Sequence, residues 1–103
     1  MTKLSDLADM FCYGATKQPQ NGDVAVIKVG ANAGTKVFIV TSDNAATITK
    51  NYIGVRCKDS ITAKKVFEAL TTDKCKNAII ALRHGAGQQT ISLADLKNVE
   101  VDL

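Results

Sequence analysis

Three short runs of this chain carry apolar residues at consecutive positions, so both faces of each run are apolar. The runs are Val24–Val29, Val37–Thr41 and Ala78–Leu82. Successive side chains of a strand point to opposite faces, so a strand with one face in water should alternate apolar and polar residues. Strands that are apolar on both faces need cover on both sides. The pattern therefore predicts a sheet covered on each face, either by this chain or by another one.

Two further segments have helical spacing. The first helix is predicted near the N-terminus and would end at Gly14; its apolar stripe is Leu4, Leu7, Ala8 and Phe11. The second and clearer helix is Ile61–Leu70, which Asp59 or Ser60 could cap. Its buried stripe is predicted to be Ala63, Val66, Phe67 and Leu70.

The apolar runs also predict two hairpins. The first pairs Val24–Val29 with Lys36–Thr41 around the glycine-containing loop Gly30–Gly34. The second pairs Ala78–Arg83 with Thr90–Leu93 around the loop His84–Gln89.

Two more strands are predicted from alternation. Tyr52–Cys57 places Ile53, Val55 and Cys57 on one face, and Asn98–Leu103 alternates cleanly enough for a half-buried edge strand. Between the strands, Ala94–Lys97 is either a helical turn or a loop, and Ser42–Asn51 has no clear period.

These elements predict an α+β fold with a mainly antiparallel sheet of five to six strands and two short helices. Such a sheet could close into a barrel. With 103 residues, the chain is expected to form one domain over 1–103.

The glycine-containing loop Gly30–Gly34 follows a predicted strand, which is also where phosphate-binding loops occur. A P-loop needs Gly-Lys-Ser/Thr at its end and a helix after it. This chain has Gly34-Thr35-Lys36 and then another predicted strand. A plain hairpin turn is favoured.

Charge is unevenly distributed along the chain, whose net charge is +3. The segment Arg56–Arg83 contains seven cations and three anions. A solvated protein surface explains such an excess, but a basic segment can also attract polyanions. The residues that could contact nucleic acid there are Arg56, Lys58, Lys64, Lys65, Lys74, Lys76, Arg83 and His84.

The sequence contains no recognisable catalytic or metal-binding motif. His84 is the only histidine, and no local pattern supplies it with a nucleophile and an orienting carboxylate. The three cysteines, Cys12, Cys57 and Cys75, form no C-x-x-C pair. We therefore expect no enzyme activity, no cofactor, no metal and no small-molecule substrate. Reduced thiols and the lack of a signal peptide or membrane-spanning run predict a cytoplasmic protein, with a virion as another possible location.

The favoured functional hypothesis is a non-enzymatic assembly or interaction module, such as a virion- or scaffold-type subunit. It would form a homo-oligomer or bind a protein partner through an apolar sheet face or through its last strand, with Val99, Val101 and Leu103 at the interface. The alternative is a nucleic-acid-binding protein that uses Arg56–Arg83 and the His84 loop. A small enzyme, or an inhibitor of one, is the third hypothesis. No membrane partner is expected.

Overall fold

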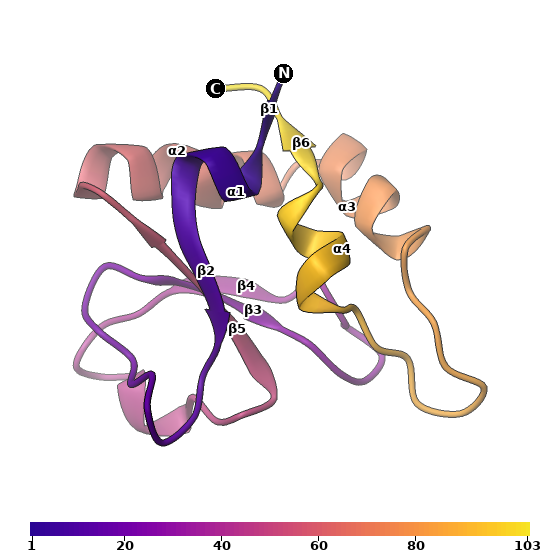
Figure 1. Ribbon diagram of the computed structural model, residues 1–103, viewed down its shortest axis with the longest axis horizontal. Coiled ribbons are helices and arrows are strands. Elements are labelled where there is room, and N and C mark those ends of the chain that lie inside the picture. Colours follow the sequence, from indigo (N-terminus) through magenta and orange to yellow (C-terminus); the bar gives the residue numbers. More distant parts are fainter.

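A computed structural model describes all residues, 1–103, and shows an α+β fold (Figure 1). Six antiparallel strands form two sheets, and neither sheet closes into a barrel. The larger sheet has four strands in the order β2-β5-β3-β4: β2 is Ala8–Cys12, β5 is Tyr52–Cys57, β3 is Val24–Ile27 and β4 is Val37–Ile39. The smaller sheet pairs β1, Thr2–Lys3, with β6, Glu100–Val101. The predicted fold class is confirmed.

The helices are short and most are capped by side chains. They are α1 (Leu4–Leu7), α2 (Ser60–Leu70), α3 (Asp73–Ile80), α4 (Leu93–Lys97) and the 3₁₀ turn η1 (Ala45–Thr47). The side chains of Asp59, Thr72 and Ser92 accept hydrogen bonds from the backbone N–H groups of the first turns of α2, α3 and α4. Figure 1 shows α2 at the same end of the molecule as both chain termini, with the long loops at the opposite end.

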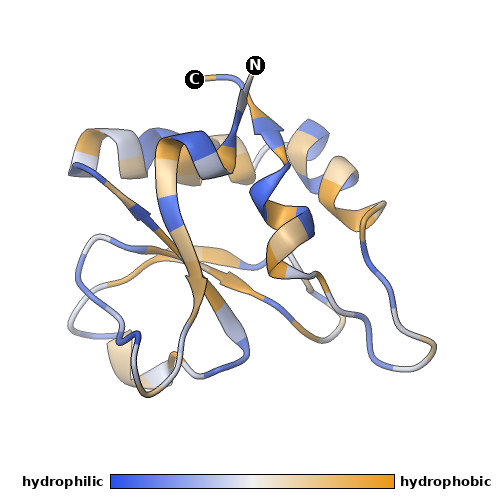
Figure 2. Ribbon diagram, in the orientation of Figure 1, coloured by the Kyte–Doolittle hydropathy of each residue, from blue (hydrophilic) through white to orange (hydrophobic).

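One face of the larger sheet packs against α2. Val24 and Val26 of β3 and Ile53 and Val55 of β5 are fully buried there. The helix contributes Ala63, Val66 and Leu70, with Phe67 partly buried against them. This is the stripe that the spacing predicted. Figure 2 shows the crossing strands in orange and the lower loops mostly in white and blue.

The opposite face of the sheet is covered by the chain's own aromatic residues and loops. A second buried cluster comprises Phe11, Tyr13, Ala25, Val40 and Tyr52, and it is flanked by Ile27, Phe38, Ala45 and Ile48. Phe11 and Tyr13 meet edge to face with ring centroids 5.3 Å apart. The predicted two-sided cover is therefore present, and no second chain is needed to supply it.

The predicted N-terminal helix is wrong beyond Leu7. The helix α1 ends there, and the chain continues as strand β2, which pairs with β5 from Ala8↔Cys57 to Cys12↔Ile53. In this conformation Met10 enters one core cluster and Phe11 the other. A helix would place these two side chains only 100° apart, whereas a strand sends them to opposite sides of the sheet. Pairing with β5 thus overrides a helical spacing of only two turns.

The predicted strand Ala78–Leu82 and its hairpin are also wrong. Residues Asp73–Ile80 form α3, and Thr72 begins it by accepting a hydrogen bond from the Cys75 N–H. Cys75 and Ile79 lie four residues apart and face the core, while Ile80 and Leu82 are exposed. The run therefore combines a buried residue near the end of a helix with exposed apolar residues, and it does not form a strand. Of the hairpin, only a single bridge between His84 and Thr90 exists.

The structure agrees with most of the remaining predicted elements. The first hairpin pairs Val24 with Ile39 and Val26 with Val37. Strand β5 has the predicted bounds, and Ala94–Lys97 is helical as part of α4. The last strand is shorter than predicted, because only Glu100–Val101 pairs with another strand.

Gly54, in the middle of β5, gives a first testable prediction. A Cβ atom at this position would lie 2.6 Å from the Phe11 ring and 2.7 Å from the Tyr13 ring. Because both rings belong to the packed second cluster, Gly54→Ala should lower the free energy of unfolding by about 1–3 kcal/mol. Urea denaturation followed by circular dichroism measures this change.

The matched control is Gly87→Ala, since a Cβ there meets no atom within 4 Å and needs no positive φ. It should change the unfolding free energy by less than about 0.5 kcal/mol. Equal stability of the two variants would contradict the packing of Phe11 and Tyr13 described above.

Candidate nucleic-acid interface

The loops at the end of the sheet away from the termini are poor in acidic residues, with Asp43 the only one among them. Between Met10 and Lys58 the chain has six Lys and Arg residues and only two acidic ones, Asp23 and Asp43. Most of these cations lie on a group of loops that we call the distal loop surface, residues 14–18, 28–36, 42–51 and 84–89. Figure 1 shows these loops in the lower half of the view.

Backbone hydrogen bonds hold neighbouring loops of this surface together. The Lys28 N–H donates to the Asn51 carbonyl at 2.7 Å, and the Gly30 N–H donates to the Gln89 carbonyl at 2.8 Å. Loop 28–36 therefore lies between loop 42–51 and loop 84–89. These main-chain hydrogen bonds fix the order of the three loops along the surface.

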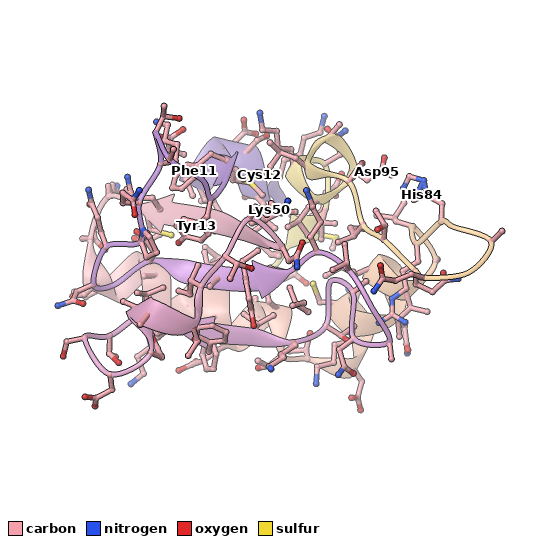
Figure 3. All side chains as sticks on the ribbon, turned by 90° about the horizontal axis from the view of Figure 1, so that it is seen from below. Phe11, Cys12, Tyr13, Lys50, His84 and Asp95 are labelled. Carbon is pink, nitrogen blue, oxygen red and sulfur yellow. The ribbon has the colours of Figure 1, made fainter.

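Four lysines, Lys17, Lys28, Lys36 and Lys50, belong to this surface. The Lys17 ammonium lies 5.2 Å from the centroid of the Phe11 ring. The Lys28 ammonium lies 3.9 Å from the Cys12 sulfur, which makes a weak contact. Figure 3 views the surface from below, with Cys12 and Lys50 near the middle and His84 at one side. None of the four takes part in a salt bridge, so their charges are free to meet an anion.

An ion pair between the buried carboxylate of Asp23 and the partly exposed Arg56 supports the side of this surface nearest Lys17. Asp23 is 2% exposed and precedes β3; its two carboxylate oxygens accept hydrogen bonds from Nε and Nη2 of Arg56, each at 2.9 Å. The Tyr13 hydroxyl donates to the same carboxylate at 2.9 Å. Arg56 also donates to the Gln18 carbonyl at 3.0 Å and stacks 4.7 Å from the Phe11 ring centroid.

This network shifts the pKa values of its members in opposite directions. Burial alone would raise the pKa of Asp23, but the hydrogen bonds from Arg56, Gln20 and Tyr13 lower it below its ordinary value. The pKa of Tyr13 is raised by burial and then by its hydrogen bond to Asp23. The carboxylate is therefore ionised and the phenol protonated at neutral pH, and Arg56 is committed to Asp23.

The structure scatters the eight basic-segment residues predicted to contact nucleic acid. Arg56 and Arg83 are bound within the chain, and His84 lies 3.5 Å from the Asp95 carboxylate. Lys74 pairs with Asp102 at 3.6 Å, close to the termini. The remaining four, Lys58, Lys64, Lys65 and Lys76, lie on α2 and α3 or just before α2. Only His84 of the eight presents an exposed side chain on the distal loop surface.

Sequence reasoning missed the four surface lysines because they are far apart along the chain. The distribution of acidic residues along the sequence did contain a signal for them. The stretch Val24–Ser42 has no acidic residue at all, although it is not dense in cations. Because no acidic residue offsets the few lysines of this segment, its net charge is positive and it produces a positive electrostatic potential.

The predicted interface residues lie at the other end of the molecule. Val99 and Val101 are 5% and 3% exposed and belong to the main core cluster. Their side chains are therefore not available to a partner. Leu103 is 56% exposed.

The cysteines are all free thiols. Burial raises the pKa of Cys75, and burial together with nearby Asp59 raises that of Cys57, which keeps both thiols protonated at neutral pH. No three His, Cys, Asp or Glu side chains come together in a group that could hold a metal ion. None of the helices combines the length and the apolar composition that a membrane-spanning helix needs.

No protein-family model and no curated protein matches the chain. Its fold is similar to a solved structure, the type-I restriction-modification system S subunit from M. genitalium, with a TM-score of 0.70 and 19% sequence identity. The match covers 97% of this chain and 33% of that one, so this chain spans about a third of the S subunit's length. At this identity the likeness establishes the fold.

The expected assembly module is wrong. That hypothesis placed the interface on an apolar sheet face or on the last strand. Phe11, Tyr13 and Tyr52 cover the sheet face from within, and Val99 and Val101 of the last strand are buried. The fold is instead similar to that of about one third of the S subunit named above, a finding that favours the nucleic-acid alternative over the assembly module.

The ion pair of Asp23 gives a prediction about stability and pH. At pH 7, Asp23→Asn should lower the free energy of unfolding by about 2–4 kcal/mol, because Arg56 then lacks its carboxylate. The lowered pKa of Asp23 stabilises the fold above about pH 4, the unfolded value, and this contribution is lost as the pH falls through the folded value. Urea denaturation across pH 2–7 measures both effects, and the variant should lose the acid-dependent part.

Tyr13→Phe is the matched control, since it removes one hydrogen bond and keeps the ion pair. It should cost about 1–2 kcal/mol and retain the acid dependence of the wild type. Wild-type stability of Asp23→Asn at pH 7 would show that the ion pair does not hold the fold.

Proposed function

We propose that this chain is a DNA-binding module that contacts duplex DNA through the distal loop surface and carries no catalytic activity. The observation that carries the proposal is the similarity of fold, over 97% of the chain, to the S subunit of a type-I restriction-modification system. Restriction-modification systems act on DNA. The same name describes one subunit of a larger system, which supports a protein partner as well.

The charges of the distal loop surface support this function. Its lysines come from three separate loops and have no acidic partner, whereas the cations on α2 and α3 have Glu68 and Asp73 beside them in sequence. A duplex presents two rows of phosphates to a protein. Lysines distributed over several loops can contact such rows at several points, with glutamine and asparagine side chains between them to reach base edges.

The aromatic residues favour duplex DNA over a single strand. Proteins that bind single strands stack bases on exposed aromatic rings. Here Phe11, Tyr13 and Tyr52 are at most 9% exposed, so these rings are used inside the fold. The distal loops themselves contain no aromatic residue.

We also propose that residues 1–103 form one domain, as expected from the length. The pairing of β1 with β6 joins the two ends of the chain, and the two core clusters lie on the faces of one sheet. The free thiols support a cytoplasmic location.

A salt titration tests the DNA-binding proposal. The double variant Lys28→Gln, Lys50→Gln should weaken binding of a 30-base-pair random duplex about tenfold or more at low salt. If each lysine contacts one phosphate, the slope of log Kobs against log salt should become smaller by about 2. Fluorescence anisotropy with a labelled duplex measures both quantities.

The matched control is Lys64→Gln, Lys65→Gln, which removes the same charge from α2. It should change the affinity less than twofold and leave the salt slope unaltered. A larger loss in the control would assign binding to the basic segment Arg56–Arg83 instead. No binding by the wild type at low salt would overturn the proposal.

A further inference from the structure

Arg83 lies between the end of α3 and the loop His84–Gln89. Its side chain is half-buried, and Nε donates to the Ala33 carbonyl at 2.7 Å while Nη2 donates to the Thr35 hydroxyl at 3.1 Å. Both acceptors belong to the loop Gly30–Thr35, about fifty residues away in sequence. The planar guanidinium can make two such bonds at fixed spacing, which an ammonium cannot.

The loop Gly30–Thr35 is contacted twice by this part of the chain, once from α3 and once from the residues after it. Gly34 is buried with a φ of +78°, and a Cβ there would overlap the Ile79 side chain. Ile79, in the last turn of α3, and Arg83, three residues after the helix ends, both contact this loop. Ile79 fills the space that the glycine leaves, and Arg83 holds the carbonyl of the residue before it.

The loop that follows Arg83 is tied at its base and free at its tip. The His84 N–H donates to the Thr90 carbonyl at 3.0 Å, and the Thr90 N–H donates back at 2.8 Å. The Gly30 N–H donates to the Gln89 carbonyl. The tip, Gly85–Gln88, is exposed. The two loops thus form one unit in which Arg83 is the side-chain link.

We propose that Arg83 is a positioning residue that sets where the tip of the His84–Gln89 loop meets DNA, and that it does not itself contact a phosphate. This inference rests on the proposed DNA-binding function. Gln88 at the tip has an exposed amide, the kind of group that pairs with the edge of adenine. Readout of a base edge requires a fixed loop, whereas attraction to phosphates does not.

The two roles of an arginine predict different measurements. If Arg83 contacts a phosphate, its removal should reduce the salt slope by about 1 and weaken binding to every duplex equally, and lysine should restore much of the affinity. If Arg83 positions the loop, the salt slope should stay the same. The preference for a chosen sequence over random DNA should then fall, and lysine should fail to restore it.

The experiment compares Arg83→Gln, Arg83→Lys and Thr35→Val. The probes are a 30-base-pair duplex selected from a random pool by the wild-type protein and an unselected random duplex. We expect both arginine variants to lose about tenfold in the ratio of the two affinities, with the salt slope changed by less than about 0.3. Thr35→Val should lose less, and its effect should not add to that of Arg83→Gln, because both remove the same hydrogen bond.

Lys28→Gln serves as a contrast to the arginine variants, because Lys28 is proposed to contact a phosphate. We expect it to reduce the salt slope and to leave the ratio of the two affinities unchanged. Restoration of the ratio by Arg83→Lys, or a slope reduced by about 1 in Arg83→Gln, would overturn the positioning role. Circular dichroism melting of each variant excludes loss of the fold, and Thr35→Val tests the same link if Arg83→Gln is unfolded.

Amide hydrogen exchange tests the link without DNA. The Gly30 and Thr90 amides should exchange at least tenfold faster in Arg83→Gln, while those of β5 should be unchanged. Equal protection of these amides would overturn the proposal. If the wild type binds neither duplex, the proposed function fails, and hydrogen exchange still decides whether Arg83 holds the two loops together.

Discussion

The ion pair between Asp23 and Arg56 is the interaction on which the architecture depends most. It joins the start of β3 to β5, and through Tyr13 it also holds the end of β2. The Asp23 carboxylate is only 2% exposed, and its burial is tolerated because Arg56, Tyr13 and the Gln20 N–H donate hydrogen bonds to it. Arg56 also packs over the Phe11 ring, so the polar network is in direct contact with the second apolar cluster. That cluster closes the sheet face that would otherwise need another chain.

The sequence predicted correctly those elements for which the local signals agree with one another. Strand β5 has its predicted bounds because alternation and two-sided burial agree there, and α2 is correct because its stripe and its Asp59 cap agree. The run Ala78–Leu82 misled because apolar residues at a helix end look like a buried strand when only five positions are considered. Phe11 misled because the pairing of β2 with a strand some forty residues away decides its conformation.

The candidate site was less predictable than the fold, for reasons that lie in long-range contacts. Arg83 reads as a free cation in sequence, but its partners are the Ala33 carbonyl and the Thr35 hydroxyl. Arg56 likewise reads as part of a basic patch, and its charge is neutralised by Asp23. Conversely, Lys17, Lys28 and Lys50 are isolated in sequence and come to the same end of the sheet only in the folded chain. Cation density along a chain therefore says little about which charges reach solvent unpaired.

The pairing of Thr2 with Val101 has a consequence for how such a fold can be used. Neighbouring strands lie about 5 Å apart, so the polypeptide enters and leaves this structure at nearly one point. A host protein could therefore accept the whole unit in place of a surface turn, with little change to its own backbone. The distal loop surface would then project away from the attachment point. Two host chains could then differ by the whole unit. The S subunit, in which the similar fold covers 33% of the chain, is an example of a chain long enough to carry it.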